Sequence, residues 1–78
     1  MEPYLITVDS LGRGTFKHDG EEFLHILEGV LEFTFGGKKY LVKPGDSLYF
    51  DSGVEHSGKS AGHRKVRMLC IIYNYRRS

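Results

Sequence analysis

Cysteine, tryptophan and long apolar runs are scarce or missing in this 78-residue sequence. The single cysteine, Cys70, excludes a disulfide within the chain, and a lone thiol is typical of proteins in a reducing compartment. No apolar run approaches the roughly 20 residues that a membrane span requires, and the acidic start MEPYLITVD does not resemble a signal peptide. We therefore expect a cytoplasmic protein without a membrane segment.

The chain is also short and has little net charge. A domain of this size buries only about 60% of its unfolded surface, so a metal ion or a partner subunit commonly supports its core. The formal net charge is +1, but ten acidic and five basic residues precede Ser57, and six basic residues with no acid follow from there. No stacking-aromatic RNA motif accompanies this basic end. We expect contact with nucleic acid to be indirect, if it occurs at all.

Short apolar segments separated by turn residues predict an all-β protein. Residues 30–35 alternate apolar and polar side chains, as in a strand with one buried face. Gly36-Gly37 then suits a two-residue turn that requires positive φ, and Pro44-Gly45 suits the centre of a type II turn. Strands at this spacing indicate a sandwich or barrel. They are expected at residues 4–8, 23–27, 30–35, 38–42, 47–50 and 65–75.

One of these segments is ambiguous on local grounds. Residues 19–29 also fit a short helix, with Asp19 as N-cap, acids in the first turn and Gly29 just after the end. Phe23, Ile26 and Leu27 would then share one face. The strand is favoured because the segments that follow pair most simply as a sheet.

Three polar side chains stand out around these strands. His18 and Glu22 lie four positions apart, and an even separation places both on one face of an extended chain, although Gly20 between them can bend freely. His56 stands alone after the Pro-Gly-Asp turn. Two imidazoles and one carboxylate are the ligand set of an open facial metal site. They are candidate metal ligands, and the alternative is a polar pocket lining that holds no metal.

From about Phe16 to His56 the sequence resembles the conserved-barrel cupin family. The similar part reads HDGEEFLHILEGVLEFTFGGKKYLVKPGDSLYFDSGVEH. It looks especially like the cupin modules at the C-terminal end of some bacterial helix-turn-helix regulators. The first cupin motif has a His-x-His pair, then Glu, then Gly, and the second has Pro-Gly-Asp followed by a His.

The resemblance implies a small double-stranded β-helix, the jelly-roll barrel, as a single domain over residues 1–78, with motif 1 at about 16–29 and motif 2 at about 43–56. His18 matches the second His of the pair, Glu22 the motif carboxylate, Gly29 the motif glycine and His56 the His of the second motif. Phe16 stands where the first His would be, so one donor of the four is missing. The other three can still hold Fe, Mn, Ni or Zn as a divalent ion and leave positions open for water or substrate.

The barrel interior is expected to be apolar around these donors. Alternation along the strands turns Leu24, Phe33 and Phe50 inward, and Cys70 is expected there as a small buried hydrophobe. Tyr49 is one of three tyrosines that could add a phenol. The expected ligand pocket comprises Phe16, Leu24, Phe33, Tyr49, Phe50 and Cys70.

The outer face carries residues that a partner subunit could cover. His25 lies three positions from Glu22, and an odd separation on a strand points to the opposite face. Apolar side chains share that face and leave more hydrophobic surface than a small monomer should expose. We expect a homodimer that covers part of this surface, formed by Phe23, Leu27, Leu69 and Ile71.

Two functions remain open on the sequence alone. The first is a small-molecule-binding barrel, with or without a metal, that acts as a ligand-binding or sensor module. The alternative is a metal-dependent enzyme of the oxygenase or isomerase type that uses the 2-His-1-carboxylate site. No helix-turn-helix segment is present in these residues, so a DNA-binding partner domain would have to be a separate chain or be missing.

Overall fold

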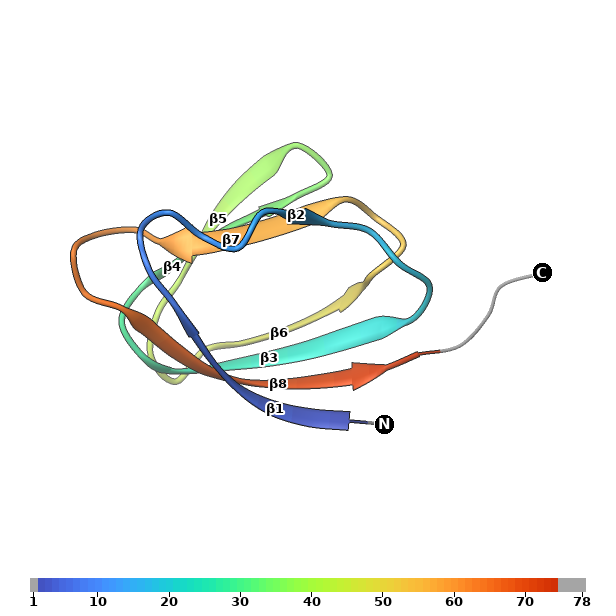
Figure 1. Cartoon of the computed structure of the whole chain (residues 1–78), viewed down its shortest axis with the longest axis horizontal. Helices are drawn as coiled ribbons and strands as arrows, with labels where there is room; N and C mark the ends of the chain where they lie inside the picture. Colours follow the sequence, from blue (N-terminus) through green and yellow to red (C-terminus); the bar gives the residue numbers. More distant parts are fainter. Residues whose placement is uncertain (1, 75–78) are drawn as a thin grey trace.

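The computed structural model describes residues 2–74 and consists of two four-stranded antiparallel sheets that face each other (Figure 1). One sheet has the strand order β1-β8-β3-β6 and the other β2-β7-β4-β5. The all-β fold class and the jelly-roll double-stranded β-helix are therefore confirmed. The strands in this range are β1 (Glu2–Val8), β2 (Thr15–Phe16), β3 (Glu21–Glu28), β4 (Leu31–Phe35), β5 (Lys38–Val42), β6 (Ser47–Asp51), β7 (His56–Ser60) and β8 (Val66–Tyr73).

The ambiguous segment after Asp19 is a strand. β3 alternates partly buried and buried positions over Glu21–Ile26, and it pairs with both β6 and β8, so it lies inside its sheet. The register shifts between Ile26 and Glu28, where a bulge lets the strand bend toward β4. Pairing on both edges gives the backbone amides and carbonyls of β3 hydrogen-bond partners in β6 and β8. This outweighs the local helix signals of Asp19 and Gly29.

Both turns predicted from glycine are present. Gly36 and Gly37 have φ of 56° and 84° between β4 and β5, as a type I′ hairpin requires. The amide of Asp46 bonds the Lys43 carbonyl at 2.9 Å, and Gly45 has φ of 90° between them. This second turn leads the chain from β5 into β6 in the opposite sheet.

Two strands have no counterpart in the sequence-based prediction. β7 contains only polar residues and a glycine, and β2 is two residues long, so neither shows an apolar period. β7 pairs with β2 on one side and β4 on the other. The expected closing strand 65–75 is β8, and Tyr75, like Arg76 and Arg77, falls outside the described residues.

The core fills the space between the sheets. Even-numbered positions of β3 and β8 face inward, and Glu22, Leu24 and Ile26 stand opposite Ile72, Cys70 and Met68. The buried apolar side chains that pack together are Val8, Leu24, Ile26, Leu31, Phe33, Val42, Phe50, Val66, Met68 and Cys70. Among residues 2–74 there is no helix of the length and hydropathy needed to cross a membrane.

Candidate metal centre and its cavity

The three candidate ligands come from three different segments that meet at one point between the sheets. His18 lies in the loop between β2 and β3, Glu22 is the second residue of β3, and His56 is the first residue of β7. Their ligand atoms all lie within 4.8 Å of one another. Glu22 and His56 are buried at 8% and 5% exposure, whereas the His18 side chain is 36% exposed. The site is therefore closed on the barrel side and accessible past His18.

Backbone hydrogen bonds hold the His18 loop in place. The His18 amide bonds the Ser52 carbonyl, and the Ser52 amide bonds the Gly20 carbonyl, both at 2.9 Å. Gly20 has φ of +126°, and a Cβ there would lie 2.4 Å from the Tyr73 carbonyl oxygen. Only glycine fits this position, so Gly20 sets the bend that directs His18 toward Glu22.

Glu22 is the centre of the cluster. One carboxylate oxygen, Oε1, lies 2.7 Å from His18 Nε2 and 3.4 Å from His56 Nε2. The other nitrogen of each ring faces a backbone carbonyl: His56 Nδ1 lies 2.8 Å from the Val54 oxygen, and His18 Nδ1 lies 3.3 Å from the Asp19 oxygen. A carbonyl only accepts, so each Nδ1 donates to its carbonyl in the tautomer that places the proton there, and in that tautomer Nε2 faces Glu22 without a proton.

This tautomer leaves three electron-pair donors aimed at one another. With Nδ1 protonated, each neutral imidazole presents the lone pair of Nε2 to the Glu22 oxygen, which also only accepts. A cation must lie among such donors: without a metal it is a proton, shared in the 2.7 Å hydrogen bond between His18 Nε2 and Glu22 Oε1, and with a metal it is the ion itself. The backbone carbonyls thus do what outer partners do in metal sites, where they orient each histidine and select its ligating nitrogen.

The donor set fits a divalent transition metal. Metal–nitrogen and metal–oxygen bonds of about 2.1 Å at right angles place neighbouring donors about 3 Å apart, close to the 2.7 and 3.4 Å separations around Glu22. Two imidazoles and one carboxylate leave other coordination positions open, as in facial-triad iron sites. His18, Glu22 and His56 are the residues that would hold the ion.

Aromatic rings surround the buried imidazole. The His56 ring centroid lies 4.9 Å from that of Phe50, 6.2 Å from Phe16 and 6.4 Å from Phe33. Such rings exclude water and lock the rotamer of His56. They leave the ligand side of the imidazole facing Glu22.

A cavity of about 520 Å³ opens beside the three donors. This volume is within the range of small-molecule sites. Its walls are mainly apolar, and all three donors contribute to them. Five of the six expected pocket residues line it, namely Phe16, Leu24, Phe33, Phe50 and Cys70.

The expectation that Tyr49 lines the pocket is wrong. Tyr49 is 69% exposed and stands between the inward-facing Leu48 and Phe50, so alternation turns it to the outer face. There it pairs with Phe23, and its hydroxyl donates to the Glu21 carboxylate. His25 also lies on the outer face, as expected, with Nδ1 2.7 Å from the Ser47 hydroxyl.

Cys70 contributes a neutral thiol to the cavity wall. The pKa of the Cys70 thiol is raised to about 11. Burial is the largest cause, the Glu22 carboxylate also raises the pKa, and the Arg13 guanidinium lowers it. A thiol with this pKa is protonated at neutral pH, and it is therefore neither a nucleophile nor an anionic ligand there.

Sequence reasoning missed one charged residue of the cavity. Arg13, which lies in the loop between β1 and β2, lines it and is not among the expected pocket residues. The available signal was a lone cation between two glycines, Gly12 and Gly14. A lone cation in a loop does not by itself predict a cavity residue. Only the topology, which brings this loop over β7, places it at the cavity.

The family model described as "Cupin domain" matches residues 7–72, which include all three donors. The chain belongs to the cupin family. Among curated proteins this cupin is 38% identical over 60 residues to the oxalate-binding protein of Thermotoga maritima, covering 76% of this chain and 50% of that protein. It is 32% identical over 66 residues to an uncharacterized protein of Methanocaldococcus jannaschii, covering 81% of this chain and 53% of that protein. The chain thus spans about half the length of these relatives.

Solved structures include similar barrels that belong to an iron enzyme. An Fe(II) form of HppE in complex with its substrate superposes with a TM-score of 0.80 at 26% identity, over 91% of this chain and 44% of that one. Hydroxypropylphosphonic acid epoxidase from S. wedmorenis in complex with fosfomycin superposes with a TM-score of 0.80 at 25% identity, over 91% of this chain and 42% of that one. A cupin protein from Bacteroides fragilis superposes with a TM-score of 0.82 at 23% identity, over 92% of this chain and 64% of that one. At this identity the likeness supports the fold alone.

Proposed function

We propose that this cupin binds a small organic acid at a divalent metal ion held by His18, Glu22 and His56. The observation that carries the proposal is the convergence of two imidazole Nε2 atoms on one carboxylate oxygen, at 2.7 and 3.4 Å. A divalent ion there would act as a Lewis acid and offer open positions to a carboxylate. The apolar cavity next to the donors would receive the remainder of the acid.

The similarity to an oxalate-binding protein supports the ligand class. That relative is named for binding a small dicarboxylate, and the matched region covers 76% of this chain. Oxalate has no apolar portion, whereas the cavity measures about 520 Å³ and has mainly apolar walls. The proposal therefore covers small organic acids in general.

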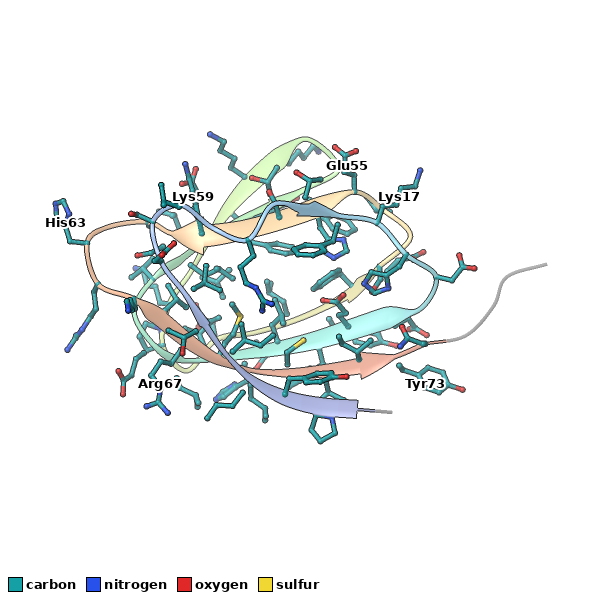
Figure 2. The ribbon with its side chains drawn as sticks, in the orientation of Figure 1. Lys17, Glu55, Lys59, His63, Arg67 and Tyr73 are labelled. Carbon is teal, nitrogen blue, oxygen red and sulfur yellow. The ribbon has the colours of Figure 1, made fainter. Side chains whose placement is uncertain are left out.

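The test is calorimetric titration of the tag-free protein, first with Mn(II) or Fe(II) and then with oxalate. We expect one metal per chain in the wild type, loss of metal binding in His56→Ala, and unchanged binding in His63→Ala. His63 is a matched control because it extends outward from the loop between β7 and β8 (Figure 2) and does not line the cavity. Metal binding that survives in His56→Ala would contradict the proposal.

An iron-dependent enzyme is the second candidate function. The barrel is similar to that of an Fe(II) enzyme at 26% identity, and the three donors would leave coordination positions open for a substrate. Near-stoichiometric iron in protein purified without an affinity tag, together with acid-dependent O₂ consumption, would favour the enzyme. Acid binding without turnover would favour a ligand-binding or sensor module.

Three further expectations stay predictions. A DNA-binding domain that works with a sensor module would be a separate chain or is missing, and co-purification tests for the former. Cytoplasmic location can be tested by fractionation. A homodimer would cover the outer face of the β1-β8-β3-β6 sheet, where Phe23 stands opposite Ile71 and Leu27 is 43% exposed. Light scattering that shows a stable monomer at micromolar concentration would contradict the dimer.

A further inference from the structure

Among residues 2–74, Arg13 is the one lysine or arginine that lines the cavity, where the other charged or titratable lining groups are the three donors, Cys70 and Tyr4. It is exposed and still lines the cavity, so it stands at the opening. None of the ion pairs or side-chain hydrogen bonds within residues 2–74 uses its guanidinium. An unpaired guanidinium on the wall of an apolar cavity is a ready site for an anion.

The loop that carries Arg13 is fastened to the opposite wall of the opening. The Asp9 carboxylate accepts from the amides of Leu11 and Gly12, at 3.0 and 3.3 Å, and the Asp9 carbonyl accepts from the Ser60 amide at 2.8 Å. Gly12 has φ of +76°, and a Cβ there would lie 2.9 Å from the Gly58 carbonyl oxygen. These contacts hold the backbone that precedes Arg13, so they fix where its side chain begins relative to the cavity.

Other cations of the barrel do not face the cavity. Lys17, Lys59 and Arg67 point outward from the ribbon in Figure 2. Lys59 and Arg67 also have partners, since Lys59 Nζ lies 3.7 Å from Glu32 and Arg67 Nη1 lies 3.1 Å from Glu28. Arg13 therefore differs from all three in direction, and from Lys59 and Arg67 in pairing.

We propose that Arg13 anchors a second anionic group of a ligand whose first carboxylate is bound at the His18–Glu22–His56 centre. This inference rests on the proposed function and adds the substrate class, an acid with two anionic ends separated by a short apolar body. Apolar side chains of the same cavity, among them Leu24, Leu31 and Met68, suit that body. Oxalate lacks such a body, because its two carboxylates are directly bonded.

The electrostatics of the cavity agree with this arrangement. Both the Glu22 carboxylate and the Arg13 guanidinium act on the thiol of Cys70, the first raising its pKa and the second lowering it. The charges of both polar ends therefore reach the thiol of Cys70. A ligand with two charged ends would complete the charge pairing at the Arg13 end.

The test compares succinate with succinamate, the same acid with one carboxylate replaced by a neutral amide. Both are titrated calorimetrically into the Mn(II)-loaded protein and its variants. We expect the wild type to bind succinate about tenfold or more tightly than succinamate, as charge-assisted hydrogen bonds imply. Arg13→Gln should abolish this difference, and Arg13→Lys should keep part of it because the charge remains without the planar fork.

Arg64→Gln is the matched control, because Arg64 is exposed and does not line the cavity. It should leave the ratio of the two affinities unchanged, and oxalate affinity should change less than about threefold in Arg13→Gln. If Arg13→Gln lowered the affinities for oxalate and succinate equally, Arg13 would attract anions in general. That result would overturn its proposed role as an anchor for the second anionic group. An unchanged succinate-to-succinamate ratio in Arg13→Gln would overturn the inference and leave the proposed function standing. Failure of the wild type to bind any of these acids would overturn both.

Discussion

Replacing Glu22 by glutamine separates metal binding from folding at the proposed centre. The carboxylate oxygen lies 2.7 and 3.4 Å from the two Nε2 atoms, so it is both the anionic ligand and the source of repulsion when no cation is present. An amide has nearly the same shape, and its NH₂ group can donate to an imidazole lone pair. We expect Glu22→Gln without metal to be within about 1 kcal/mol of the wild type in free energy of unfolding.

The metal response should differ sharply between the two proteins. With free metal at 100 times the dissociation constant, binding stabilises the wild type by about 2.7 kcal/mol, which is roughly 10–20 °C in Tm for a domain of this size. Loss of the anionic ligand should weaken binding about 100-fold or more. At the same metal concentration the stabilisation then falls to about 0.4 kcal/mol, or roughly 2–3 °C.

Differential scanning fluorimetry and urea unfolding, each with Mn(II) and with chelator, measure these changes. His25→Gln is the control, because His25 contacts Ser47 on the outer face and should keep the full metal response. Equal Tm shifts for the wild type and Glu22→Gln would refute the assignment of Glu22 as a ligand. A metal-free Glu22→Gln variant destabilised by several kcal/mol would refute the argument that the donors repel one another.

Three other substitutions test the surroundings of the centre. Gly20→Ala should cost about 1–3 kcal/mol in free energy of unfolding and weaken metal binding, because a Cβ would lie 2.4 Å from the Tyr73 carbonyl oxygen at a φ of +126°; unchanged metal affinity would contradict its role in directing the loop. Ser52→Ala should be neutral or stabilising by up to about 1 kcal/mol in urea unfolding, because the buried hydroxyl has no hydrogen-bond partner within residues 2–74. The pKa of Cys70 is raised from 9.0 to about 11, so its contribution to stability is complete below pH 9 and is lost as pH rises through 11. Between pH 8 and pH 11 the wild type should therefore lose about 2 kcal/mol more than Cys70→Ala, and parallel losses would show that the thiol is not held protonated by the fold.

Most strands of the fold could be predicted because their signals are local. Alternation in residues 30–35 and the turn glycines depend only on neighbours in sequence, and the hairpin from β4 to β5 agrees with them. β7 escaped prediction because it consists of His56, polar residues and Gly58. Its pairing with β2 and β4 makes it a strand, and pairing is not visible in composition.

Residue type and the two-residue period were enough to predict the all-β class and the inward face of most apolar strands, and the resemblance to the cupin motifs pointed to the three candidate donors. Only the tertiary structure decided that Glu22 lies 2.7 Å from His18 and 3.4 Å from His56, and that Tyr49 turns outward while Arg13 lines the cavity. Distances across 34 positions of sequence depend on strand pairing and on how far the two sheets stand apart. Those are properties of the packed core as a whole, which no short segment contains.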